Sequence, residues 1–209
     1  MYRRYFKRWI DIITSILSIV LLSWLFLIIV ILIKITSKGP VFFKQRRIGL
    51  EKKEFYILKF RTMRSSTPSD VATHLLKNPE QYITRIGRFL RKTSLDELPQ
   101  LINILKGEMS FVGPRPALWN QYDLIAERDK YNVNNVRPGL TGWAQVNGRD
   151  EIPINMKAKY DGEYINKSSL GFDVYCVILT AFCIIGHKGY KEGLVEGENN
   201  YEKGSGSWS

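Results

Sequence analysis

The sequence predicts an α+β fold that is mainly helical and begins with a membrane helix. An almost uninterrupted apolar run extends from Ile12 to Ile33, about the length that a helix needs to cross a bilayer. Further along, short β-branched and aromatic runs alternate with segments whose apolar residues recur at helical spacing. We therefore expect a re-entrant membrane helix, a small β-hairpin and interfacial amphipathic helices around one domain. The expected boundaries are 1–36 for the anchor, 37–203 for the domain and 204–209 for a linker or tag remnant.

The composition fits one domain plus an anchor, with an anionic partner. The chain has 209 residues, with 31 Lys and Arg against 20 Asp and Glu and a net charge of +11. This balance favours nucleic acid, an anionic lipid surface or a phosphorylated substrate. Nucleic acid is disfavoured because the basic residues flank an apolar anchor and lack interleaved stacking aromatics. Cys176 and Cys183 lack disulfide or zinc spacing, so we interpret them as reduced, packed thiols.

Charges on both sides of the apolar run bear on its topology. Basic residues stand at positions 3, 4, 7 and 8 before it and at positions 34, 38, 44, 46 and 47 after it. Because positive flanks tend to stay in the cytoplasm, a helix that enters, bends and returns to the same face satisfies both ends. Ser23 can produce the bend by bonding its hydroxyl to a carbonyl one turn back. A plain single span is the alternative.

The rest of the chain divides into recognisable segments. Val41–Phe43 and Phe55–Leu58 are typical of strands, with Arg46–Gly49 between them, which predicts a hairpin. The stretch Thr84–Gly107 has apolar residues at helical spacing on either side of a Thr-Ser pair, which predicts two helices. Leu170–Ile185 is apolar but short and contains an Asp, so it fits an interfacial helix or a core helix.

Asp96 and Glu97 fall in the opening turn of the second predicted helix, which is capped by Ser94 or, because Pro99 prefers the first turn, by Asp96 itself. Their setting, Ser94-Leu95-Asp96-Glu97, matches a capping box, in which Glu97 bonds back to the Ser94 amide and neither acid does chemistry. The same position favours an ionised carboxylate, because the positive end of a helix attracts negative charge. Three rigid segments that carry Arg follow in the sequence, which suggests a diphosphate site around these acids.

These motifs together resemble the monotopic phosphoglycosyl transferases, the bacterial sugar transferase family that starts glycoconjugate assembly on a lipid carrier. The resemblance covers nearly all of residues 1–190. In this family the re-entrant helix bends at a Ser-Pro pair, whereas Ser23 is followed here by Trp24. The loss of proline removes the strongest kink device. The motifs that carry the resemblance are Lys59–Met63, Ser94–Gln100, Phe111–Pro116, and Arg137–Gly142 with Gln145–Arg149.

The resemblance implies a two-step transfer at the cytoplasmic face of the bacterial inner membrane. Asp96 attacks the β-phosphorus of a UDP-sugar, releases UMP and holds the sugar phosphate as an acyl phosphate. Polyprenyl phosphate, in bacteria undecaprenyl phosphate, then accepts the sugar phosphate in the first membrane step of glycoconjugate synthesis. Family habit favours an N-acetylated amino sugar.

The resemblance also implies Mg²⁺, held by Asp96 or Glu97 together with phosphate oxygens. Glu97 is assigned to metal positioning or to proton handling. Asp161 and Asp173 stand where the family tends to carry Asp, with a structural role as the alternative. The residues expected to bind substrate are Arg91, Arg115, Lys59, Arg61, Arg137, Gln145 and Arg149.

Two other functions fit parts of the sequence. A catalytically silent membrane adaptor would use the basic surface to bind anionic lipid, and its acids would only cap a helix. A hydrolase would pass the sugar phosphate from Asp96 to water, without a carrier. Dependence on Mg²⁺, UDP-sugar and carrier separates the three.

Overall fold

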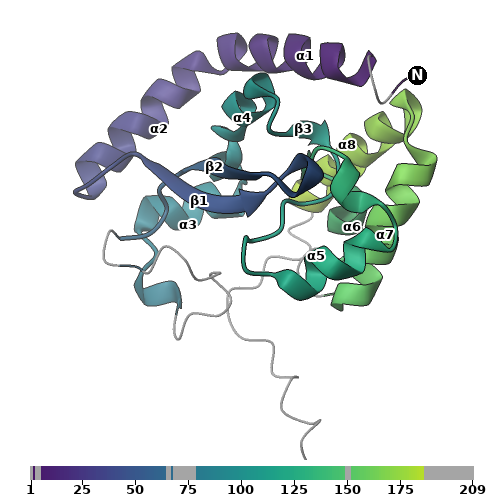
Figure 1. The fold of residues 1–209 in the computed structure, drawn as a ribbon. Coiled ribbons are helices and arrows are strands. Elements are labelled where there is room, and N and C mark those ends of the chain that lie inside the picture. Colours follow the sequence, from purple (N-terminus) through teal and green to yellow (C-terminus); the bar gives the residue numbers. More distant parts are fainter. Residues whose placement is uncertain (1, 3–5, 65–66, 68–78, 149–151, 186–209) are drawn as a thin grey trace, which may run out of the picture.

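The computed structural model is mainly helical and describes residues 2, 6–64, 67, 79–148 and 152–185 (Figure 1). The expected tail at 204–209 lies outside these residues. The mainly helical class and the small hairpin are confirmed. The elements are α1 (Lys7–Leu21), α2 (Ser23–Thr36), β1 (Phe42–Ile48), β2 (Glu54–Phe60), α3 (Arg85–Lys92), α4 (Gln100–Lys106), β3 (Ser110–Val112), α5 (Tyr122–Asp129), β4 (Gly139–Thr141), α6 (Trp143–Val146), α7 (Ile154–Lys167) and α8 (Leu170–Ile185), with short 3₁₀ turns at Leu50–Lys52, Pro79–Gln81, Leu95–Glu97 and Val133–Asn135.

The apolar N-terminal run forms two helices bent by 62° at Leu22, and they follow the top and one flank of the molecule in Figure 1. The Ser23 hydroxyl donates to the Val20 carbonyl at 2.9 Å, as the sequence predicted for a bend without proline. Within the described part of the chain, no single helix has the length and apolar character to cross a bilayer, whereas the bent pair together has both. Trp24, directly after the bend, is 61% exposed.

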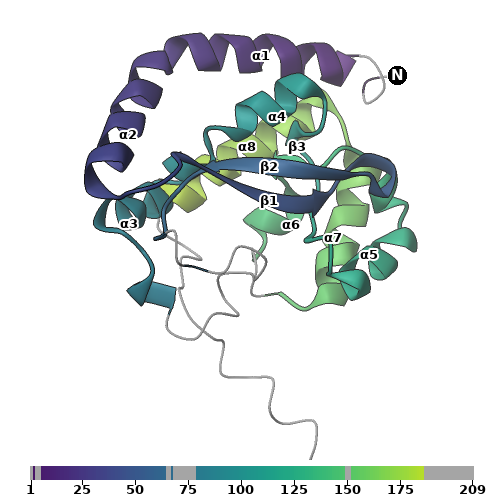
Figure 2. The same cartoon turned by 60° about the vertical axis from the view of Figure 1, so that its left-hand side comes forward.

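α1 lies along the domain and presents one polar and one apolar face (Figure 2). On the inner face, Arg8 donates to the carbonyls of Ile104 and Leu105 at the end of α4. On the outer face, large side chains such as Trp9 and Leu17 are exposed. α1 is therefore an amphipathic helix bonded to the domain, with its apolar side facing outward.

β1 and β2 form an antiparallel hairpin that is longer than the sequence suggested. The register runs from Phe42 opposite Phe60 to Ile48 opposite Glu54. The segment Arg46–Gly49, expected between the strands, instead contributes three residues to β1, which pair with residues 54–56 of β2. On the outer side of β1, Arg47 and Ile48 bond to the 116–118 segment. The chain reverses at residues 49–53, where the φ angles of Glu51 and Lys52 are 53° and 60°.

The free edge of β2 is closed by one side chain from α4. The Leu58 amide donates to Asn103 Oδ1 at 3.0 Å, and Asn103 Nδ2 donates to the Tyr56 carbonyl at 2.8 Å. The Asn103 side chain is fully buried. It replaces a neighbouring strand for these two groups, so α4 is fixed against the hairpin.

The two helices expected within Thr84–Gly107 are present, but the second begins later than predicted. Gly107 ends α4 with φ 85°, as expected for a C-terminal glycine. Asp96 lies instead in a separate 3₁₀ turn before α4, and Ser94, at φ 56°, makes no capping bond with its side chain. The Ser94 amide bonds to the Arg91 carbonyl. The capping-box interpretation is therefore wrong.

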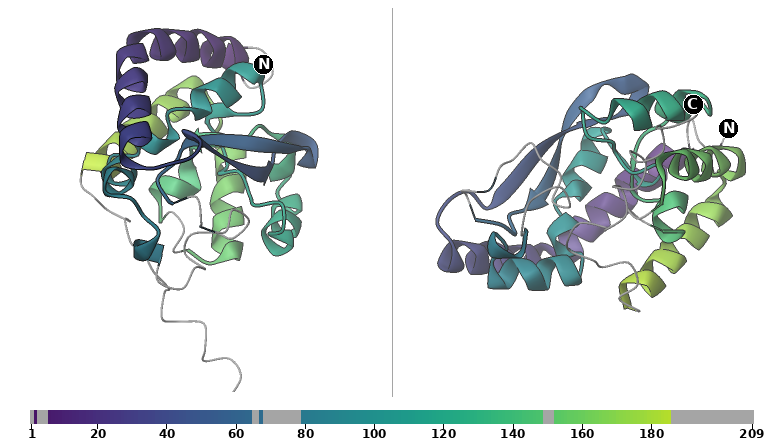
Figure 3. Two further views of the ribbon diagram at one scale, coloured as in Figure 1. Left: turned by 90° about the vertical axis from the view of Figure 1, so that its left-hand side faces the viewer. Right: turned by 90° about the horizontal axis from the view of Figure 1, so that it is seen from below.

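α7 and α8 pack against the short parallel pair β3 and β4 on the side of the domain away from the hairpin (Figure 3). One face of α8 is buried around Cys176, while Val174, Ile178 and Phe182 on its other face are exposed. Both cysteines are free thiols, as predicted. The segment Leu170–Ile185 is thus a helix that packs on the domain with one side and exposes apolar surface on the other.

Gly87 is required for the contact between α3 and the chain after β2. A Cβ at this position would lie 2.0 Å from the Thr62 carbonyl oxygen, so Gly87→Ala must push α3 away. We expect a loss of about 1–3 kcal/mol, which is typical of overpacking, and a lower Tm in detergent. Gly171→Ala in α8 is the matched control because nothing lies within 4 Å of its Cβ position. An unchanged Tm for Gly87→Ala would contradict this packing.

Candidate active site

Asp96 lies in the middle of the 3₁₀ turn between α3 and α4 and is only 8% exposed. The turn is held by its two apolar neighbours, Leu95 and Leu98, which pack into a cluster with Ile29 and Ile33 of α2. The carboxylate is therefore carried by a turn whose other side packs against α2 of the bent N-terminal helix pair.

Burial and neighbouring charges act in opposite directions on Asp96. Loss of hydration is the larger effect and raises the pKa of the carboxyl from 3.8 to about 6, with a further upward contribution from Glu97. Lys59 and Arg91 favour the charged form and lower the pKa. Asp96 is thus a poorly hydrated carboxylate that depends on nearby cations to stay ionised at neutral pH.

Glu97 connects the acidic turn to two basic residues from other elements. Lys59, near the end of β2, places Nζ 2.6 Å from Glu97 Oε1. The Arg115 guanidinium, just after β3, lies 3.7 Å from the same oxygen. Both ion pairs are partly shielded, because the Glu97 side chain is 19% exposed and the Lys59 side chain 18%.

Arg91 reaches the acids from the last turn of α3. Its Nε donates to the Thr62 hydroxyl at 2.8 Å, which fixes the guanidinium beside the turn. Thr62 belongs to the motif Lys59–Met63, but sequence reasoning missed its role, because a hydroxyl within a basic motif carries no signal of its own. The structure therefore brings together Asp96, Glu97, Lys59, Arg91 and Arg115, which we call the carboxylate cluster.

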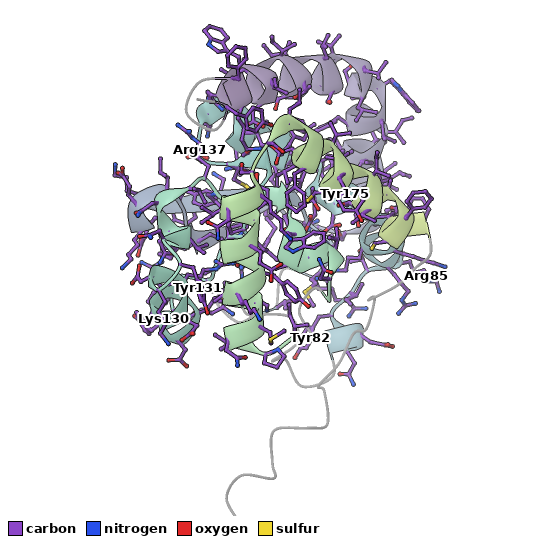
Figure 4. The ribbon with its side chains drawn as sticks, turned by 90° about the vertical axis from the view of Figure 1, so that its right-hand side faces the viewer. Tyr82, Arg85, Lys130, Tyr131, Arg137 and Tyr175 are labelled. Carbon is purple, nitrogen blue, oxygen red and sulfur yellow. The ribbon has the colours of Figure 1, made fainter. Side chains whose placement is uncertain are left out.

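Two other predicted substrate-binding arginines make structural contacts elsewhere. Arg61 is 5% exposed and donates to the carbonyls of Ser37 and Lys38 at the end of α2. Arg137 Nε donates to the Gly107 carbonyl at the opposite end of α4 from Asp96. In Figure 4, Arg137 lies near α1, across the view from the α3 residue Arg85. Both guanidiniums therefore lie at helix ends, where main-chain carbonyls accept their hydrogen bonds.

The remaining predicted residues divide between a loop contact and the undescribed part of the chain. Gln145 Nε2 donates to the Leu140 carbonyl at 3.0 Å, while Arg149 lies outside the described residues. Asp161 accepts two bonds from Arg128 in a fully buried pair. Asp173 accepts from the Lys7 ammonium, which ties α8 to α1. Both aspartates thus hold helices together.

The glycines of the two Arg-bearing motifs allow those motifs to pack on each other. A Cβ on Gly142 would lie 2.0 Å from the Gly113 carbonyl oxygen, and one on Gly139 would lie 2.1 Å from the Gly113 amide. These glycines admit the neighbouring backbone, and the contact sets the start of the loop that carries Arg115.

The carboxylate cluster has the chemistry of a site for a diphosphate. Three cations surround two adjacent carboxylates, one of which is buried and poorly hydrated. Oxygen ligands of this type suit Mg²⁺, which commonly takes one or two carboxylates and completes its shell with water and substrate phosphate. Among the described residues there is no group of three or more His, Cys, Asp or Glu that could hold a metal without such help.

Known proteins match this chain over most of its length. The model of the bacterial sugar transferase family matches residues 2–187. The UDP-glucose:undecaprenyl-phosphate glucose-1-phosphate transferase of Xanthomonas campestris pv. campestris is 42% identical over 185 residues, which are 85% of this chain and 38% of that protein. The uncharacterized sugar transferase EpsL of Bacillus subtilis (strain 168) is 38% identical over 186 residues, 89% of this chain and 90% of EpsL.

A third relative differs in the sugar that its name gives. The UDP-N-acetylgalactosamine-undecaprenyl-phosphate N-acetylgalactosaminephosphotransferase of Aeromonas hydrophila is 38% identical over 187 residues, 87% of this chain and 44% of that protein. The chain thus spans less than half the length of the relatives named for a sugar, but nearly all of EpsL. The family expected from the sequence motifs is confirmed: the chain belongs to the bacterial sugar transferase family.

Proposed function

We propose that this chain transfers a sugar-1-phosphate from a UDP-sugar to undecaprenyl phosphate, with Asp96 as the nucleophile. The observation that carries the proposal is the buried Asp96 carboxylate beside Glu97, with Lys59, Arg91 and Arg115 around them. Its relatives' names supply the substrate class, since two of them act on UDP-sugars and undecaprenyl phosphate.

In the first step, an Asp96 oxygen attacks the β-phosphorus of the UDP-sugar. The new bond is an acyl phosphate, and the bond from the β-phosphorus to the bridging oxygen breaks, so UMP leaves with that electron pair. In the second step, a phosphate oxygen of undecaprenyl phosphate attacks the same phosphorus. The bond to Asp96 breaks, and the carboxylate is restored.

The cations of the carboxylate cluster serve both steps by attracting phosphate oxygens. Arg115 and Arg91 carry planar guanidiniums that can bind two oxygens at once, and Lys59 provides a point charge. The same oxygen of Glu97 forms ion pairs with both Lys59, at 2.6 Å, and Arg115, at 3.7 Å. We therefore assign Glu97 to orienting a cation or these bases rather than to proton transfer.

Asp96 and Glu97, as adjacent carboxylates, fit a Mg²⁺ ion that shares the substrate's phosphate oxygens. When bound, the ion would offset the repulsion between a dianionic diphosphate and the nucleophilic carboxylate. Titration of metal-depleted protein with Mg²⁺ tests this assignment.

The bent helix pair supports a location at the membrane surface. Both of its ends are basic, and the 62° bend allows a helix to enter and return on one side of the bilayer. We propose that it is re-entrant on the cytoplasmic side, where the nucleotide substrate and the phosphate of the carrier meet. A helix that crosses the bilayer would expose the residues before α1 to the opposite side, where labelling of a cysteine introduced there would detect them.

Turnover should depend on both substrates, on Mg²⁺ and on Asp96. With protein in detergent, undecaprenyl phosphate and a panel of UDP-sugars that includes glucose and N-acetylated amino sugars, we expect continuous UMP release from at least one sugar. Asp96→Asn should lower kcat by about 10⁴-fold or more, because an amide is not a nucleophile for phosphorus. Equal release by the mutant would remove Asp96 from the mechanism, and no release from any sugar would favour the adaptor.

Without a carrier, the first step should stop at the covalent intermediate. We expect a burst of about one UMP per protein molecule and a mass increase equal to one sugar phosphate, located on the peptide that contains Asp96. Asp123→Asn, at an exposed position in α5, is the control and should form the same adduct. Continuous release of sugar-1-phosphate without the carrier would instead identify a hydrolase.

Neutralising Asp96 should stabilise the fold at neutral pH. Its pKa in the folded protein is about 6, above the ordinary 3.8, so the folded state binds this proton more tightly and loses stability as the pH rises from about 4 through 6. In EDTA at pH 7.5, Asp96→Asn should therefore raise the Tm and increase the free energy of unfolding by on the order of 1–3 kcal/mol. The difference should vanish below about pH 4, where the wild-type carboxyl is protonated in both states.

The control for this measurement is Asp129, whose pKa is lowered by hydrogen bonds from Lys52 and Asn134. Its folded state favours the charged form, so Asp129→Asn should not raise the Tm at pH 7.5. Equal melting temperatures for wild type and Asp96→Asn at both pH values would show that Asp96 is hydrated in the folded protein.

A further inference from the structure

Both cations that face Glu97 lie in or just after strands that are bonded to the two N-terminal helices: Lys59 is in β2, and Arg115 follows β3. Lys59 lies two residues before Arg61, which bonds to the end of α2. Arg115 lies four residues after Phe111, whose amide bonds to Asp11 of α1. α1 therefore contacts the strand before Arg115, and α2 contacts the end of the strand that carries Lys59. These two bases are the ion-pair partners of Glu97.

The contact from α1 occupies the free edge of β3. Ser110 and Val112 are the β3 residues that pair with β4, so the amide of Phe111 between them points the other way. There it donates to Asp11 Oδ1 at 3.1 Å. Asp11 is 3% exposed, although it lies in the helix that carries the outward apolar face. A buried carboxylate that accepts a main-chain amide forms one of the stronger hydrogen bonds in proteins.

A second contact pins the next residue of β3. The Tyr164 hydroxyl lies 3.0 Å from the Val112 carbonyl and 2.8 Å from Asp173 Oδ1. Burial raises the pKa of Tyr164, and Asp173 raises it further, so the hydroxyl keeps its proton. Asp173 in turn accepts from the Lys7 ammonium of α1. Phe111 thus bonds to α1 directly, and Val112 is linked to it through Tyr164 and Asp173. Both residues lie directly before the loop that carries Arg115.

The contact from α2 is made by a buried guanidinium. Arg61 donates to the Lys38 carbonyl at 3.0 Å, to the Ser37 carbonyl at 2.8 Å and to the Ser37 hydroxyl at 2.7 Å. These groups follow the last turn of α2, where main-chain carbonyls lack helical partners. The end of β2, and with it Lys59, is therefore fixed to the end of the anchor.

We propose that the anchor helices are a positioning part of the active site, in which Asp11 sets Arg115 through β3 and Arg61 sets Lys59 through the end of α2. The proposal rests on the proposed function, because its readout is sugar-phosphate transfer. Neither residue touches reacting atoms, so both are positioning residues. The same helices then attach the chain to the membrane and position the two bases. A domain without these helices is therefore expected to be a poor enzyme, even where both substrates are soluble.

The first test compares three variants of α1 in the full chain. Asp11→Leu removes the acceptor and should lower kcat/KM by about 10- to 100-fold, the usual effect of a displacement near 1 Å. Asp11→Asn keeps a side-chain oxygen for the Phe111 amide and should stay within about threefold of wild type. Thr14→Val is the matched control, because the Thr14 hydroxyl bonds only within its own helix to Ile10 and Asp11. It should leave the activity and the Tm unchanged.

A double-mutant cycle separates positioning from general destabilisation. If Asp11 acts through Arg115, adding Asp11→Leu to Arg115→Lys should lower activity by less than about threefold further. The corresponding cycle for the contact with α2 pairs Arg61→Gln with Lys59→Met. Effects that multiply fully in both cycles would overturn the proposal, since a structural role has no reason to depend on these two bases.

Two further results keep the test decisive. If Asp11→Leu does not fold, as judged by its Tm and by size exclusion in detergent, Tyr164→Phe enters the same cycle, because it removes the hydroxyl that links the Val112 carbonyl to Asp173 and leaves Asp11 in place. Wild-type protein that shows no transfer refutes the proposed function itself. Active wild type together with fully active Asp11→Leu and Tyr164→Phe refutes this inference alone.

Discussion

The burial of one carboxylate is the constraint on which the rest of the structure depends. Asp96 is 8% exposed, and an ionised acid with so little hydration is costly unless cations or hydrogen bonds replace the lost water. The fold meets this requirement with bases from three elements that are distant in sequence: Lys59 from β2, Arg91 from α3 and, through Glu97, Arg115 after β3. Even so, the pKa of Asp96 stays near 6, so the compensation is incomplete. In the mechanism that we propose this would be useful, because a poorly hydrated carboxylate gives up little water when it attacks phosphorus.

The same constraint explains why the anchor and the domain are not separable units. The turn that carries Asp96 is supported by Leu95 and Leu98, which pack with Ile29 and Ile33 of α2 in one cluster. A bilayer can solvate the outer faces of α1 and α2, but their inner faces are committed to protein contacts. The helix pair therefore supports the candidate site with its inner faces, while large apolar side chains on its outer faces are exposed. For the transfer that we propose, from a water-soluble nucleotide sugar to a lipid phosphate, this arrangement would place Asp96 close to the membrane surface.

The sequence allowed the elements to be predicted better than their contacts. Periodic apolar residues identified α3 and α4, a short apolar stretch identified α8, and the basic flanks of the N-terminal apolar run favoured the bend at Ser23. The family resemblance drew attention to all five residues of the carboxylate cluster. By contrast, β3 and β4 have three residues each and pair in parallel, and such short strands carry no periodic signal of their own. The carbonyl partners of Arg61 and Arg137 could not be predicted either, because the sequence does not distinguish an arginine that binds phosphate from one that binds a main-chain carbonyl.

The capping-box pattern at Ser94–Glu97 indicates why local rules fail at this site. Residue types and spacing satisfied the rule, yet Ser94 adopts a left-handed conformation and Glu97 turns to Lys59. A serine at φ 56° and a second acid beside a buried one are both unfavourable locally. They are maintained because Leu95 and Leu98 hold the turn from one side and the cations hold the acids from the other. A turn that needs long-range support from both sides is a poor helix start but a well-defined platform for the carboxylate that we propose as nucleophile, and only the three-dimensional structure shows that support.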